Sequence, residues 1–85
     1  MESYKIRIKK SAWDELTRIP LKSIAKTIEG IRLLALDPRP RGHVKLSAKG
    51  CLRIREWNYR IVYTVDDEVW IIQIEKLGYR RKFIR

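Results

Sequence analysis

Three stretches of the chain alternate apolar and polar residues, and this period of two predicts β-strands that bury one face. The first covers residues 4–10, and the second, residues 51–65, divides at a tight turn into two short strands. The third covers residues 69–76 and is the most apolar, so it is predicted to be the central strand of a sheet. Leu77 and Gly78 are expected to end it. Trp70, Ile72 and Ile74 are predicted to alternate toward one face of it.

Between the first two of these stretches, apolar residues recur at helical spacing and predict two helices, with breaks at Pro20 and Pro38. Ser11 is predicted to cap the first helix, with Asp14 three residues later in an approximate capping box. The first helix is expected to bury Ala12, Leu16 and Ile19. The second helix is expected to bury Leu21, Ile24, Ile28, Ile31 and Ala35.

The order of these elements predicts an α+β fold of the type β-α-α-β-β-β. A helical hairpin would pack on one face of a twisted, mostly antiparallel sheet, because short connections join the last three strands. Residues 44–46 either begin a further strand or lead into the next one. A chain of 85 residues is expected to form one domain, here residues 1–85.

The composition favours a reducing compartment and suggests no metal or cofactor site. The single cysteine, Cys51, has no partner in the chain, which is typical of a cytoplasmic protein. No apolar run reaches the roughly 18 residues of a membrane span, and the N-terminus lacks the apolar core of a signal peptide. One histidine and one cysteine do not complete a zinc site. We therefore expect a soluble cytoplasmic protein that uses no cofactor.

The charge of the chain narrows the choice of partner. Twenty lysines and arginines against ten acids give a formal net charge of +10. Such an excess favours polyanions, either nucleic acid or an acidic protein. The excess is concentrated in residues 39–60, which hold seven basic residues and one acid, Glu56. A basic surface that is simply solvated is the alternative.

Three arginines carry the candidate chemistry. Arg53 and Arg55 lie two apart on a predicted strand and so point to one face, and Arg60 opens the strand after the turn. Guanidinium groups bind phosphate oxygens in pairs and can stabilise the charge that builds up during phosphodiester cleavage. They are poor general acids or bases, because their pKa exceeds about 12. The alternative is an exposed basic strand that discourages strand addition.

Three motifs follow one another in the second half of the chain: VKLSAKG, CLRIREWNYRIVYTV and EKLGYRRKFIR. Together with the opening strand and the helices, they resemble the RelE/ParE toxin superfamily over essentially the whole chain. In the RelE branch, the resemblance implies a microbial-ribonuclease-like fold and a ribosome-dependent endoribonuclease, which cleaves mRNA in the A site through attack by the 2′-hydroxyl. It also implies an acidic, RelB-like antitoxin as partner in a hetero-oligomer, and a toxin that is monomeric when free.

The resemblance places the catalytic site on four arginines. The family's basic pair before the turn corresponds to Arg53 and Arg55, its arginine after the turn tyrosine to Arg60, and its arginine after the late glycine to Arg80. These side chains would position the scissile phosphate and stabilise its added charge. Contacts to RNA are expected around them from Lys45, Lys49, Trp57, Tyr79 and Arg81.

His43 and Tyr79 are the candidates for proton transfer. His43 is the one side chain of a type that titrates near neutrality without help, and an ordinary loop residue is the alternative. Tyr79 stands where other members of the superfamily have histidine, so it would donate a proton or stack on a base, unless its role is structural. Trp57, at the turn, would stack on a nucleotide or cap the core.

The chain departs from the family pattern in two ways. Both members of its basic pair are arginine, where some relatives have a lysine that could act as a base, and Phe83 and Ile84 occupy the region where many have tyrosine. These departures favour a second hypothesis, a ParE-like, non-enzymatic inhibitor of DNA gyrase. The retained arginine cluster and the short helices oppose it. A third hypothesis is a nucleic-acid-binding relative without toxicity.

Overall fold

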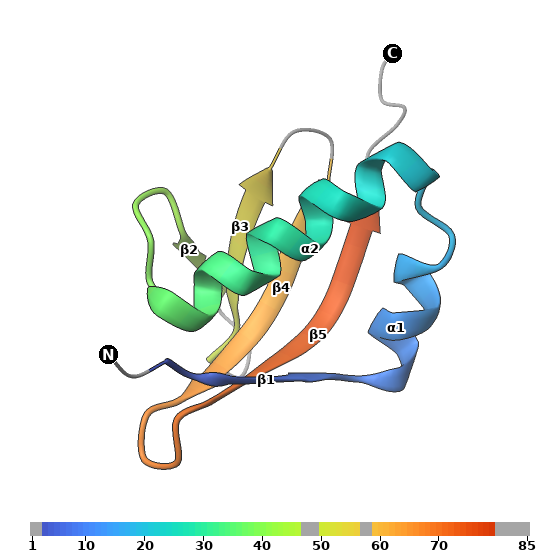
Figure 1. Cartoon of the computed structure of the whole chain (residues 1–85). Helices are drawn as coiled ribbons and strands as arrows, with labels where there is room; N and C mark the ends of the chain where they lie inside the picture. The colour runs from blue at the N-terminus through green and yellow to red at the C-terminus, as the bar shows by residue number, and fades with distance from the viewer. Residues whose placement is uncertain (1–2, 47–49, 57–58, 80–85) are drawn as a thin grey trace.

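The structure, a computed structural model, describes residues 3–46, 50–56 and 59–79. These residues form the following helices and strands: β1 (Lys5–Ile8), α1 (Lys10–Leu16), α2 (Leu21–Leu36), β2 (Val44–Lys45), β3 (Leu52–Glu56), β4 (Tyr59–Asp66) and β5 (Ile71–Tyr79). Figure 1 shows their arrangement. The predicted α+β fold is confirmed, and the residues that sequence left open as a strand or an approach form the separate short strand β2.

The strands form one mixed sheet in the order β1-β5-β4-β3-β2. β1 is parallel to β5, and all other neighbours are antiparallel. The apolar strand β5 is therefore an interior strand, but β4 occupies the centre predicted for it. β5 has β1 on one side and β4, β3 and β2 on the other, so the centre of the five strands falls on β4. β1 can lie parallel to β5 because the chain passes through both helices before it returns to the sheet.

The core lies between the helices and one face of the sheet. Figure 1 shows α2 crossing the sheet and α1 beside β5. The buried apolar side chains are Ala12, Leu16, Ile19, Ile31, Leu34, Leu52, Ile54, Tyr59, Ile61, Tyr63, Ile72, Ile74 and Leu77. The strand residues among them point toward the helices, so their neighbours in sequence point to the other face. Within the described residues, neither helix is long and apolar enough to cross a bilayer.

α1 begins earlier than predicted, and Ser11 is not its cap. The capping position is Lys9, and no side chain caps the helix. The backbone explains the difference, because Lys9 N still donates to Ile74 O of the sheet while Trp13 N already donates to Lys9 O. The strand thus turns directly into the helix. The predicted inward residues of this segment are buried, namely Ala12, Leu16 and Ile19.

α2 buries a stripe that is rotated relative to the predicted one. Leu21 and Ile28 are 84% and 42% exposed, so the prediction that they are buried is wrong. Thr27 is buried instead, because its Oγ1 donates a hydrogen bond of 2.9 Å to the carbonyl of Ser23 and is thereby satisfied. The buried residues of α2 are Thr27, Gly30, Ile31 and Leu34. Thr27 and Gly30 are therefore buried at positions that hydrophobicity alone would leave exposed to solvent.

β5 begins and ends later than the predicted strand. Trp70 belongs to the turn before it, where it adopts a positive φ of 61° and stacks on Tyr4 with ring centroids 4.9 Å apart. It is 42% exposed and lies outside β5, so the prediction that it shares a strand face with Ile72 and Ile74 is wrong. The predicted break at Leu77 and Gly78 is also wrong, because the strand continues to Tyr79. Pairing with β4 extends over this last part of β5 and holds it in the sheet.

Candidate functional site

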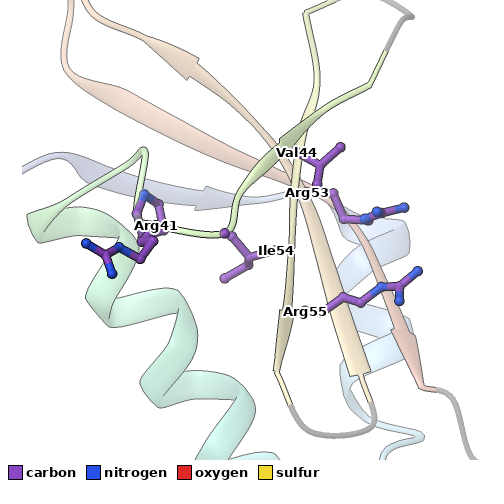
Figure 2. A pocket seen from close by; sticks show the side chains of 7 residues that line it. Arg41, Val44, Arg53, Ile54 and Arg55 are labelled. Atoms are coloured by element: carbon purple, nitrogen blue, oxygen red, sulfur yellow. The ribbon is translucent and has the colours of Figure 1, made fainter.

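β3 presents Arg53 and Arg55 on the face of the sheet that points away from the helices. Leu52 and Ile54 of this strand are buried in the core, whereas Arg53 is half-buried and Arg55 is exposed. Figure 2 shows the two arginine side chains extending to the same side of β3, away from Ile54. The alternation of the strand therefore places both guanidinium groups side by side.

Arg60 of β4 lies directly opposite Arg55. The hydrogen bond from Leu46 N to Cys51 O, 2.9 Å long, shows that the backbone groups of Cys51 face away from β4. In an antiparallel ladder, the N–H and C=O groups of every second residue point to the same side. The backbone groups of Arg53 and Arg55 therefore also face away from β4. Arg55 and Arg60 thus form a non-hydrogen-bonded pair, the type in which cross-strand side chains come closest together.

The arginine cluster, Arg53, Arg55 and Arg60, has no acidic partner among the described residues. None of the ion pairs in this part of the chain includes any of the three. Like charges directly opposite each other on neighbouring strands repel. The Nε of Arg53 is in addition buried without a hydrogen-bond partner in the described part of the molecule. A phosphate bound here would relieve the repulsion between the guanidinium groups.

Gly78 of β5 makes room for Arg60. The two residues are paired across β4 and β5. A Cβ atom at position 78 would lie 3.2 Å from Nε and 3.4 Å from Cγ of Arg60, so the arginine side chain lies across the glycine. Glycine usually weakens the interior of a strand, and a close approach of another group is a common reason for its presence.

Lys76 joins the arginine face through a β-bulge, which simple alternation does not predict. Lys76 pairs with Val62, whereas the next residue of β4 pairs with Ile74, so Glu75 is the extra residue. Without the bulge, Lys76 would share the buried face of Ile74. With it, Leu77 is buried and Lys76 is exposed. The sequence carries a signal for this shift, because the apolar spacing changes from two to three between Ile74 and Leu77.

Glu75 is held by two neighbours. Gln73 Nε2 donates to Glu75 Oε2 at 2.9 Å, and Lys9 Nζ lies 3.2 Å from Glu75 Oε1. The hydrogen bond from Gln73 lowers the pKa of Glu75 most, partial burial opposes this effect, and Lys9 lowers the pKa further. Glu75 is therefore an engaged carboxylate and is unsuited to donate a proton at neutral pH.

The structure does not bring Lys45 and His43 together with the arginine cluster. Lys45 pairs with the buried Leu52, and cross-strand partners share a face, so Lys45 lies on the helix side of the sheet. His43 is half-buried, and its Nδ1 lies 2.8 Å from the carbonyl oxygen of Pro40. Because that oxygen can only accept, this contact places a proton on Nδ1 and uses it within the loop.

The remaining candidates lie partly outside the described residues. Tyr79 is the last residue of β5, and its backbone pairs with Tyr59. The candidates outside the described residues are Lys49, Trp57, Arg80 and Arg81. The described part of the site therefore consists of the three arginines and Lys76, a group of cations suited to bind a phosphodiester and stabilise added negative charge.

Comparison with known proteins identifies the class to which this fold and this site belong. The chain matches the family model of the ParE toxin of the type II toxin–antitoxin system parDE over residues 6–82. The protein therefore belongs to this family of toxins, within the RelE/ParE superfamily. A comparison with curated proteins gives no significant match.

Solved structures of RelE toxins share the whole fold. The chain resembles the RelBE2 toxin–antitoxin complex of Mycobacterium tuberculosis with 26% identity and a TM-score of 0.83, over 92% of this chain and 99% of that chain. It resembles the archaeal RelE–RelB complex of Pyrococcus horikoshii OT3 with 28% identity and a TM-score of 0.80, over 94% and 98%. The isolated RelE toxin of Escherichia coli, at 20% identity and a TM-score of 0.79 over 95% and 88%, shares the fold.

Proposed function

We propose that this toxin cleaves mRNA on the ribosome. In this proposal it binds mRNA in the A site, and the 2′-hydroxyl of one nucleotide attacks the adjacent phosphorus, leaving a cyclic phosphate. The observation that supports the proposal most directly is the cross-strand pair of Arg55 and Arg60, with Arg53 beside it, on the open face of a RelE-like fold.

The arginines would act on the charge of the transition state. As the hydroxyl adds to phosphorus, negative charge accumulates on the non-bridging oxygens, and cations already in place stabilise it without reorganising. Arg55 and Arg60 face each other and would hold these oxygens between them. Arg53, on the same face of β3, would supply a further guanidinium group. Arg80, which lies outside the described residues, would act near the leaving oxygen.

Three kinds of group near the described site, the arginines, Glu75 and His43, are poorly suited to proton transfer. Arginine stays charged, Glu75 is an engaged carboxylate, and Nδ1 of His43 is occupied within its own loop. In this proposal, the groups that move protons lie outside the described residues or belong to the ribosome and its bound water. The chain itself would then contribute binding, orientation and charge stabilisation.

An acidic, RelB-like antitoxin is the proposed partner that neutralises the toxin. The net charge of +10 favours an acidic segment that wraps the basic surface and folds on binding. The similar structures from M. tuberculosis and P. horikoshii are complexes of RelE toxins with RelB antitoxins. We further propose that the chain acts in the cytoplasm as a single domain, residues 1–85, and that it is monomeric when free.

The proposal is tested by mapping transcript 5′ ends after induced expression. Cleavage on ribosomes predicts new ends inside codons of translated messages, absent when translation is blocked before induction. The informative variant is Arg60→Ala, because removal of one preorganised charge contact commonly lowers the rate by about 10²–10³-fold. The matched control is Arg32→Ala, which removes an arginine that pairs with Glu29 on α2. Intact messages in arrested cells would refute ribonuclease activity.

A gyrase inhibitor is the second candidate function. Two observations favour it: the matching family model is that of ParE, and neither His43 nor Glu75 is placed to transfer a proton at the arginine cluster. A purified gyrase supercoiling assay separates the two functions. Inhibition of supercoiling together with intact mRNA would support the gyrase function, whereas cleaved mRNA and unchanged supercoiling would support the ribonuclease.

A further inference from the structure

A notch opens at the edge of the sheet between β3 and the loop that precedes β2. Its volume is about 330 Å³, and its walls are Pro40, Arg41 and Gly42 on the loop side and Arg53, Ile54 and Arg55 on the strand side, with Val44 at one end. Figure 2 shows Arg41 on the loop side of the notch, and Arg53 and Arg55 extending from β3 in the opposite direction, away from Ile54. The notch therefore shares two residues of β3 with the arginine cluster, whose side chains extend away from it.

The backbone of β3 is open along this notch. β2 begins at Val44, which pairs with Arg53, so β3 continues past the start of its neighbour. The N–H and C=O of Arg55 face the same way as those of Cys51 and Arg53, away from β4. The notch thus combines an apolar wall at Ile54 with an unpaired strand edge that can both donate and accept hydrogen bonds.

The loop side of the notch is held in place by hydrogen bonds. Tyr63 Oη donates to the carbonyl oxygen of Pro38 at 2.7 Å, and Arg39 binds both carboxylate oxygens of Asp67 at 2.9 and 3.4 Å. The backbone N–H of His43 donates to Pro40 O at 3.1 Å. Because both ends of the loop are tied to the sheet or to the loop itself, the notch is formed before any ligand arrives, which reduces the entropy cost of binding.

The charge of the notch selects for an anion. Among the residues that the structure describes, its lining contains three arginines, Arg41, Arg53 and Arg55, and no acid. Arg41 is exposed, and none of the described ion pairs includes it. The side chains of Arg53 and Arg55 extend from β3 away from Ile54, so their guanidinium groups lie on the adjoining face of the sheet. Cations at the notch and on that face suit a chain with phosphates at regular intervals, and the notch volume lies at the lower end of the range for small-molecule sites.

We propose that the notch binds one nucleotide of single-stranded RNA, adjacent to the phosphate held by the arginine cluster. The base lies against Ile54 and Pro40 and forms hydrogen bonds with the backbone of Arg55. The following phosphate contacts Arg41. This inference rests on the proposed action on mRNA. It means that the notch of the toxin contacts the nucleotide next to the cleaved bond directly.

The test is an NMR titration of the ¹⁵N-labelled toxin with a 2′-O-methyl trinucleotide, which binds but lacks the attacking hydroxyl. The amide resonances of Gly42 and Arg55 are expected to shift on binding. The variant Arg41→Ala is expected to weaken binding roughly tenfold and to lower the slope of log K against log salt by about one. Arg32→Ala removes the same charge from α2 and is expected to leave both values unchanged.

Three outcomes would overturn the proposal. The first is that the Gly42 and Arg55 amides do not shift at saturation, and the second is that the two variants lose affinity equally. The third is that inorganic phosphate or an abasic trinucleotide causes the same shifts, which would indicate an anion site without base recognition. The readout requires no cleavage, so it is independent of the proposed ribonuclease activity. Intact mRNA in cells with an Arg41-dependent titration would refute the activity alone, whereas cleaved mRNA with an unshifted Arg55 amide would refute the notch.

Discussion

Arg60 lies across Gly78, its partner on the neighbouring strand, so closely that a Cβ atom at position 78 would stand 3.2 Å from the Arg60 Nε. The glycine therefore determines how closely the Arg60 side chain approaches the backbone of the sheet. The same arginine faces Arg55 on its other side. The position of Arg60 is thus determined by the backbone of Gly78 on one side and by the positive charge of Arg55 on the other.

Gly78→Ala is expected to lower activity with little effect on folding. The added methyl group has to displace the Arg60 side chain by a few tenths of an ångström, and misplaced catalytic groups lose rate steeply. Stability should stay within about 1 kcal/mol of the wild type, because alanine also reduces the entropy of the unfolded chain. Thermal unfolding and transcript 5′-end mapping measure the two effects.

Gly78→Val provides the graded comparison for this prediction. Its branched side chain is larger and should displace Arg60 further, so cleavage should fall in the order glycine, alanine, valine. Equal cleavage by all three proteins would show that the position of Arg60 over residue 78 does not matter for the reaction.

Arg60→Ala is expected to keep or raise the stability of the fold while it removes activity. Like charges directly opposite each other destabilise a sheet, so loss of one should stabilise the protein by up to about 1 kcal/mol. The gain should shrink in high salt, where the charges are screened. Urea unfolding at low and high ionic strength measures it.

Arg32→Ala is the control for the charge effect. This substitution removes an exposed ion pair with Glu29 and is expected to cost about 0.5 kcal/mol or less. If Arg60→Ala instead destabilised the protein more than Arg32→Ala at low salt, the arginine cluster would be a stabilising feature of the sheet and not a strained binding site.

Alternation alone predicts the face on which the arginines lie, because a period of two is a local property of a strand. Arg53 and Arg55 share a face for this reason, and the residues between and before them are buried. The same rule fails at Lys76, where one extra residue in β5 reverses the faces. The change in apolar spacing between Ile74 and Leu77 was the available signal.

Contacts between distant segments could not be predicted in this way. The position of Arg60 over Gly78 depends on the register of β4 against β5, and the rotation of α2 depends on the fit of small residues such as Thr27 into the core. The notch beside β3 depends on where β2 begins. Each is decided by packing between elements that no local pattern records.

Glu15→Ala is expected to loosen the end of β5. Glu15 Oε1 accepts a hydrogen bond of 2.8 Å from the backbone N–H of Leu77, at a point where β1 no longer covers β5. Loss of this acceptor leaves a partly buried N–H without a partner and should cost about 1–3 kcal/mol. Hydrogen exchange of the Leu77 amide should accelerate, since its local opening becomes easier.

Two variants distinguish this role of Glu15 from a general effect on α1. Glu15→Gln keeps a carbonyl oxygen as acceptor and should retain most of the protection of Leu77. Asp14→Ala removes an exposed ion pair of 3.6 Å with Lys10 in the same helix and should leave exchange at Leu77 unchanged. Equal exchange rates at Leu77 in the wild type and Glu15→Ala would contradict the assignment.

Tyr63→Phe is expected to reduce the stability of the fold near neutral pH. It is also expected to lose less stability than the wild type as the pH rises into the alkaline range. Burial raises the pKa of Tyr63 from 10.0 to about 12, with Asp37 adding to the shift and Arg39 opposing it. A phenol whose folded pKa is raised stabilises the fold below pH 10, where it is protonated in both states. This contribution is lost between pH 10 and about 12, because there the unfolded chain releases the proton first. At neutral pH, the variant also loses the hydrogen bond to Pro38 O, which is worth about 1 kcal/mol.

The measurement is urea unfolding of the wild type and Tyr63→Phe from pH 8 to pH 11.5. Lysine deprotonation affects both proteins alike, so the difference between them isolates Tyr63. That difference should be constant up to about pH 10 and then shrink as the wild type loses the contribution of its protonated phenol. Parallel curves over the whole range would mean that Tyr63 has the same pKa in the folded and unfolded states. The buried hydrogen bond to Pro38 would then anchor the loop beside the notch without any dependence on pH.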